Sequence, residues 1–195
     1  MKTSFYKSLF VLLGFVFVAC SSGSDDGGGT TGGSGSLSAG DPVATDQVDS
    51  GGTTQLNAFS DFTCTNNWSN RDGALGLDAY SGSGVCRVSF PGTSGKYQMS
   101  LTIQTEYDGR PLYEVSINGS VVKAGLYPLS TPRGCDCPHE TWYKECPDRN
   151  VIINVGTYII NTGDSIVFKG NDDYPCGKEH GAYAKWHRMT FTPVN

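Results

Sequence analysis

Apolar and polar side chains alternate along several segments of the chain from residue 97 onwards. The clearest case is Tyr97, Met99, Leu101 and Ile103, which are separated by Gln, Ser and Thr with the period of two expected of a strand with one buried face. The same alternation recurs in four shorter segments, at 113–117, 151–155, 166–168 and 189–191. No segment keeps a helical period over three turns. The pattern therefore predicts an all-β domain.

The residues between these segments indicate antiparallel strands. Asn118-Gly119 precedes two valines and predicts a tight hairpin, because both central positions of such a turn need positive φ. Many short strands with Gly- and Pro-rich turns are typical of an antiparallel β-sandwich of the jelly-roll type. The segments 123–150 and 170–181 lack the alternation and are predicted to be long loops, where binding sites tend to lie.

The N-terminal segment has the order of a secretory signal, with two lysines before an apolar run at 9–18 and a small residue before Cys20. This run is too short for a membrane-spanning helix of about 20 residues. The sequence Phe-Val-Ala-Cys that ends at Cys20 resembles the lipobox of bacterial lipoproteins. The resemblance implies that residues 1–19 are removed and that Cys20 is acylated, which would anchor the protein to a membrane. Ser21, rather than Asp, implies the outer membrane by the same resemblance.

The remaining chain divides by composition into a tether and a domain. Segment 20–54 is rich in Gly, Ser, Thr and Asp and has almost no large apolar side chains, so it is expected to be a flexible tether. Segment 55–195 is the size of one β-sandwich domain and is expected to be monomeric. It holds 12 Lys or Arg and 14 Asp or Glu without a basic block, which argues against a nucleic-acid partner.

Six cysteines remain once Cys20 is set aside, an even number in a chain with an export signal. Three disulfides are therefore predicted, with Cys64 and Cys86 as a local pair. The other four are expected to staple the two long loops in a connectivity that the sequence leaves open: Cys135, Cys137, Cys146 and Cys176. Zinc binding by these cysteines with His139 and His180 is the alternative. It is less favoured because the spacing matches no zinc-finger pattern, and no metal site is predicted.

Aromatic side chains in the predicted loops are the strongest indication of a binding site. Tyr and Trp combine an apolar face with a polar tip, which suits stacking on the C–H face of a sugar ring while neighbouring polar groups bind its hydroxyls. For Tyr183 and Trp186, packing between the sheets is an equally weighted alternative. The predicted ligand-binding residues are Tyr107, Arg110, Trp142, Tyr143, Asp172, Tyr174, His180, Tyr183 and Trp186.

Catalytic chemistry has weaker support. The histidines His139, His180 and His187 lie in no recognisable catalytic motif. The acidic residues that could form a pair for sugar hydrolysis have no diagnostic spacing: Asp108, Glu114, Asp172, Asp173 and Glu179. No catalytic residue is predicted, and whether the domain is an enzyme stays open, with a non-catalytic role favoured.

The C-terminal segments 162–168 and 181–191 resemble the closing strands of galactose-binding-like jelly rolls, which include non-catalytic carbohydrate-binding modules. Segment 113–119 resembles their central hairpin. The resemblance implies a sugar site in loops at one end of the sandwich. The paired Glu of calcium-containing members has no counterpart at 55–59, so no cofactor is predicted, and a structural calcium is left as an alternative that this departure disfavours.

The leading hypothesis is a membrane-tethered lipoprotein that recognises a polysaccharide through loop aromatics. The alternatives are a structural or adhesive envelope lipoprotein that binds another protein, and a small polysaccharide-active enzyme.

Overall fold

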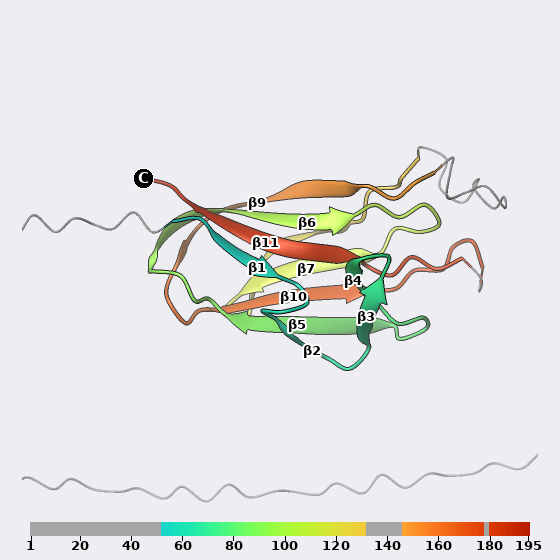
Figure 1. Ribbon diagram of the computed structural model, residues 1–195, viewed down its shortest axis with the longest axis horizontal. Helices are drawn as coiled ribbons and strands as arrows, with labels where there is room; N and C mark the ends of the chain where they lie inside the picture. The colour runs from blue at the N-terminus through green and yellow to red at the C-terminus, as the bar shows by residue number, and fades with distance from the viewer. Residues whose placement is uncertain (1–51, 132–145, 178–179) are drawn as a thin grey trace, which may run out of the picture. The chain divides into compact units, whose positions relative to one another are not determined.

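The computed structural model describes residues 52–131, 146–177 and 180–195, and in these ranges it contains strands and no helix (Figure 1). No helix able to cross a membrane is therefore found in these ranges. The eleven strands are β1 (Thr54–Asn57), β2 (Thr63–Cys64), β3 (Trp68–Arg71), β4 (Ala74–Leu77), β5 (Ser83–Ser89), β6 (Gly95–Gln104), β7 (Leu112–Ile117), β8 (Ser120–Leu126), β9 (Asn150–Ile160), β10 (Ser165–Asn171) and β11 (Trp186–Pro193).

The strands form two antiparallel sheets. The first has the order β3-β4-β11-β6-β9, with β1 also paired to β11, and the second has the order β2-β5-β10-β7-β8. When the eight strands from β4 to β11 are renumbered in chain order, the sheets read 1-8-3-6 and 2-7-4-5. This is the strand order of a jelly roll, so the predicted all-β, antiparallel sandwich is confirmed.

The hydrophobic core lies between the two sheets. Tyr97, Met99, Leu101 and Ile103 of β6 are each at most 2% exposed, and they meet inward side chains of the opposite sheet such as Phe168. The alternation at 97–103 therefore predicted the buried face correctly, because successive side chains of a strand point to opposite faces of its sheet. The other alternating segments lie in β7, β9, β10 and β11.

Two hairpins use the same turn chemistry. The predicted turn between β7 and β8 has Asn118 at φ 49° and Gly119 at φ 82°. The turn between β3 and β4 has Asp72 at φ 55° and Gly73 at φ 83°, and the sequence analysis missed it. Asp-Gly is as strong a hairpin signal as Asn-Gly. Strands β3 and β4 flank this turn. β3 shows no alternation of buried and exposed residues, and every residue of β4 is buried, so neither strand has a period of two.

The two long loops are shifted from their predicted bounds. Strand β8 continues to Leu126 because it stays paired with β7, so the first loop covers 127–149. Strand β10 continues to Asn171, and the second loop then covers 172–185 before β11 begins. The first correction concerns the end of β8, Lys-Ala-Gly-Leu at 123–126, which has only one large apolar side chain, so its strand character depends on pairing with β7 rather than on alternation.

The predicted disulfide between Cys64 and Cys86 is confirmed. The two residues are directly opposite each other in β2 and β5, with their Cα atoms 3.9 Å apart. Cys146 in the first long loop and Cys176 in the second are also disulfide-bonded. Cys135 and Cys137 lie outside the described residues.

Candidate functional site

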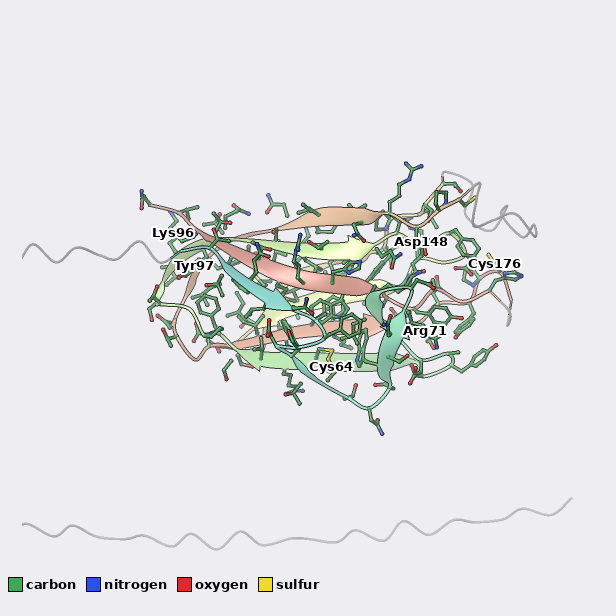
Figure 2. All side chains as sticks on the ribbon, viewed as in Figure 1. Cys64, Arg71, Lys96, Tyr97, Asp148 and Cys176 are labelled. Carbon is green, nitrogen blue, oxygen red and sulfur yellow. A yellow bond between two sulfur atoms is a disulfide. The ribbon has the colours of Figure 1, made fainter. Side chains whose placement is uncertain are left out.

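Three loops and one hairpin meet at one end of the sandwich, which we call the loop end (Figure 1). The β6–β7 loop is joined to the 127–149 loop by backbone hydrogen bonds, from the N–H of Thr105 to the oxygen of Arg149 (2.8 Å) and from the N–H of Ser130 to the oxygen of Glu106 (2.7 Å). Figure 2 shows Arg71, Asp148 and Cys176 at this end and Lys96 at the other. The fold thus brings together segments that are far apart in the sequence.

A polar pocket of about 290 Å³ opens at the loop end. Its walls come from the β3–β4 turn, the β6–β7 loop and both long loops. We call it the loop-end pocket, and its lining residues are Asp72, Glu106, Tyr107, Asp108, Asp148, Gly181, Tyr183 and Lys185. A second hollow, of about 320 Å³, lies on the second sheet and is lined by Asp61, Thr63, Arg87, Val88, Ser89 and Ser165.

Lys185 is the centre of an ion cluster in the loop-end pocket. Its side chain is 4% exposed, and its Nζ hydrogen-bonds the carboxylate of Asp148 and lies 3.4 Å from Oε2 of Glu106. The carboxylate of Asp72, at 3.7 Å and largely exposed, closes the cluster toward solvent. Buried charges persist in proteins when they are paired in this way, because removal from water is costly for each ion.

Glu106 joins the β6–β7 loop to the start of β11. Its Oε1 accepts hydrogen bonds from the backbone N–H groups of Tyr183 (3.1 Å) and Lys185 (3.4 Å). Burial raises the pKa of this carboxyl to about 8, although the nearby charge of Lys185 lowers it. At neutral pH the ammonium of Lys185 therefore finds its main charged partner in Asp148.

The pKa values of two other groups in the pocket are also shifted. Burial raises the pKa of the Asp108 carboxyl, and a side-chain hydrogen bond from the Tyr107 hydroxyl partly offsets this. Burial also tends to lower the pKa of Lys185, but the negative charges of Glu106 and Asp148 outweigh it and raise that pKa. Lys185 is therefore a permanent cation among carboxyl groups, which supply both donors and acceptors to a bound ligand.

Three tyrosines continue from the pocket to the surface, and we call them the tyrosine row. Tyr183 lines the pocket and carries the guanidinium of Arg71 over its ring, with Cζ 4.4 Å from the ring centroid. Tyr174 meets Tyr183 edge to face, with centroids 6.2 Å apart, and stacks on Tyr80 with centroids 4.7 Å apart. The row provides aromatic surface directly beside the polar pocket.

Several of the sequence-predicted ligand residues meet at this site. Tyr107 and Tyr183 line the pocket, and Tyr174 contacts Tyr183. Trp142 and Tyr143 lie outside the described residues.

Three other predicted residues do not line the pocket among the residues described, and instead hold its loops. Nε of Arg110 donates to the backbone oxygen of Tyr127 (3.2 Å). The carboxylate of Asp172 accepts from the N–H of Gly82 (3.1 Å). The backbone N–H of His180 donates to Gly177, a bond within the second long loop.

The prediction that Trp186 contacts a ligand is corrected by the structure. Trp186 is fully buried, stacked on Phe168 at 4.3 Å between ring centroids and edge to face with Phe62 at 4.9 Å. Strict alternation with the inward Met189 would turn residue 186 outward. The register shift of β11 against β6 between Trp186 and Arg188 reverses that alternation, as a β-bulge does, and directs the indole into the core.

The charged part of the site was not predicted from the sequence. Glu106, Asp148 and Lys185 were not singled out, and Asp108 was considered only for catalysis. The one usable signal is a lysine enclosed by Ala184 and Trp186 in an otherwise apolar segment. Such a lysine requires a buried partner, but its partners lie 79 and 37 positions away in the chain.

Comparison with known proteins assigns no family to this chain. No family model and no curated protein matches this sequence. Among solved structures, a family 35 carbohydrate-binding module from Clostridium thermocellum is 12% identical, with 73% of this chain and 98% of that chain covered and a TM-score of 0.45.

Two larger proteins are similar over one part of their length. They are the insecticidal crystal protein Cry2Aa (16% identity, 72% of this chain and 21% of that chain, TM-score 0.47) and a GH26-CBM35 β-(1,4)-mannanase from Podospora anserina (18% identity, 74% and 28%, TM-score 0.43). This chain therefore spans less than a third of the length of either protein. The structure itself shows a jelly roll with a charged pocket at the loop end, flanked by tyrosines.

Proposed function

We propose that the domain is a non-catalytic carbohydrate-binding module that holds a sugar unit in the loop-end pocket. One observation carries the proposal: carboxyl groups, an ammonium group and tyrosine rings line a single small pocket. A sugar ring has hydroxyls that both donate and accept, and an apolar C–H face. Asp108 and Asp148 accept hydrogen bonds from hydroxyls, Lys185 holds the Asp148 carboxylate in place, and Tyr183 presents an aromatic surface.

The size and charge of the pocket restrict the kinds of sugar that it can bind. A volume of about 290 Å³ lies at the lower end of the range for small-molecule sites, about 300–1,000 Å³, which suits one sugar unit of a longer chain. The lining has four acidic side chains and one lysine. Like charges a few ångströms apart repel, so neutral sugars are favoured over uronic acids or sulfated sugars.

Replacing Asp108 with Asn is expected to weaken binding of a neutral polysaccharide about tenfold or more, because hydrogen bonds to charged groups contribute about 1.5–3 kcal/mol. Affinity gel electrophoresis with mannan, xylan and laminarin, followed by titration calorimetry, measures the change. Asp61→Asn in the second hollow is the matched control and should leave binding unchanged. Binding that is kept by Asp108→Asn and lost by Asp61→Asn would place the site at the second hollow and contradict the proposal.

A polysaccharide-cleaving enzyme is the second candidate, and Glu106 is the observation that favours it. A carboxyl whose pKa is raised to about 8 beside other carboxylates is the pattern of a general acid in sugar hydrolysis. However, its Oε1 already accepts two backbone hydrogen bonds, and the residue is 1% exposed. Release of reducing ends from the same polysaccharides would favour the enzyme over the binding module.

Membrane anchoring through Cys20 is part of the same proposal and is supported by the lipobox-like sequence that ends at that residue. With the acidic Gly- and Ser-rich tether at 20–54, it would display the module away from the membrane. We expect Cys20→Ser to move the protein from the membrane fraction to the soluble fraction. Mass spectrometry of the N-terminal peptide should show acyl chains on Cys20, and an unmodified cysteine there would refute the anchor.

A further inference from the structure

We propose that Tyr80 forms a second sugar-binding subsite beside the loop-end pocket, so that the domain binds a chain of at least two sugar units. The inference rests on the proposed function and adds to it the length of the ligand. Tyr80 lies in the turn between β4 and β5 and is 61% exposed, the largest exposure of any aromatic residue in the described part of the chain. Sequence reasoning did not identify it.

The backbone of Tyr80 is held in an unfavourable conformation. Its φ is 60°, in the left-handed region that bulky residues rarely adopt and glycine adopts easily. A glycine or asparagine would form this turn without strain. Residues held in such conformations persist where the surrounding structure fixes them, and they cluster at ligand sites. An exposed tyrosine at a position that favours glycine therefore needs an explanation other than folding.

The surrounding contacts orient the Tyr80 ring. Its backbone N–H donates to the hydroxyl of Tyr174 at 2.8 Å, and the two rings stack at 4.7 Å with an angle of 12° between their planes. The turn is held further by the N–H of Gly82, which donates to the Asp172 carboxylate at 3.1 Å. Asp172, predicted to touch ligand, thus acts by positioning this turn. A ring fixed in advance loses little conformational freedom when a ligand stacks on it.

The Tyr80 ring is continuous with the loop-end pocket. Tyr174, which stacks on Tyr80, also meets Tyr183 edge to face, and Tyr183 lines the pocket. A sugar chain with one unit in the pocket would therefore extend along the tyrosine row, so that a further unit of the chain stacks on Tyr80. Stacking of that further unit on a tyrosine face needs no particular hydroxyl pattern. The pocket would select the sugar, and Tyr80 would add affinity for a chain.

Substitution of Tyr80 by Gly tests this inference, since it removes the ring and suits the backbone. The probes are three matched pairs of ligands: mannose and mannohexaose, glucose and laminarihexaose, and xylose and xylohexaose. For the pair that the wild type binds, we expect Tyr80→Gly to weaken hexaose binding about tenfold, to leave monosaccharide binding unchanged, and to keep or raise the melting temperature. Phe59→Ala, at an aromatic residue that is 47% exposed, is the control and should change neither affinity.

The possible results separate the subsite from the module itself. Unchanged hexaose affinity in Tyr80→Gly would overturn the subsite while the proposed function stands. Equal losses for hexaose and monosaccharide together with a lower melting temperature would also overturn it, because Tyr80 would then be structural. If the wild type binds none of the six probes, the proposed function fails, and the subsite fails with it.

Discussion

Replacing Lys185 with Met is expected to lower the free energy of unfolding by about 3–5 kcal/mol, the usual cost of removing one partner from a buried ion pair. Met keeps most of the length and the apolar stem of the side chain. It leaves the carboxyl groups of Glu106 and Asp148 facing each other without the ammonium that lies between them. Urea unfolding followed by tryptophan fluorescence measures the loss.

A surface lysine provides the control for this prediction. Nζ of Lys169 lies 3.6 Å from Oε2 of Glu114, but the two side chains are 47% and 29% exposed. Exposed pairs of this kind contribute about 0–1 kcal/mol, so Lys169→Met should change stability little. Similar losses in the two variants would show that burial does not set the strength of the Lys185 cluster.

The loss in Lys185→Met should also depend on pH. Because the pKa of Glu106 is raised in the folded protein to about 8 from its ordinary 4.5, its contribution to stability is fully present below 4.5 and is lost as the pH rises through 8. Without Lys185 that pKa rises further, so the ionised form is penalised more. The variant should therefore be destabilised more at pH 9 than at pH 6. An equal loss at both values would mean that removing Lys185 does not shift the titration of Glu106 between pH 6 and pH 9.

Trp186→Ala is the second large effect, with an expected loss of about 3–5 kcal/mol in the free energy of unfolding. The indole is fully buried and fills the space between Phe62 and Phe168, so alanine leaves a cavity between the sheets. Trp186→Phe should cost much less. It keeps an aromatic ring against Phe168, and it removes an indole N–H that has no hydrogen-bond partner within the described residues.

The same pair of variants tests the correction made for Trp186. A core role predicts that Trp186→Phe unfolds at nearly the urea concentration of the wild type and binds polysaccharide as well. Loss of binding in Trp186→Phe without loss of stability would restore the residue to the binding site.

Local sequence determined the strands from residue 97 onwards and one disulfide. The alternation of residues 97–103 depends on successive side chains only, and the Asn118-Gly119 turn depends on the φ of two residues, so both are readable without the fold. Cys64 and Cys86 were paired correctly because they lie near each other in the sequence and because the six cysteines after Cys20 are an even number. Tyr107, Tyr174 and Tyr183 were assigned to one site because aromatic side chains in predicted loops indicate ligand binding.

Tertiary structure alone decided which charged groups meet and which rings are exposed. Lys185, Glu106 and Asp148 come from three segments whose distance in the chain hides their pairing, and only the closing of the sandwich brings them together. A shift in strand register moved Trp186 from the expected surface into the core. The exposed ring of Tyr80 is oriented by Tyr174, which lies 94 positions later in the chain. The sequence by itself therefore determined a stapled jelly roll with aromatic loops, because those features follow from local backbone preferences. The arrangement of the pocket depended on long-range contacts, which no local pattern specifies.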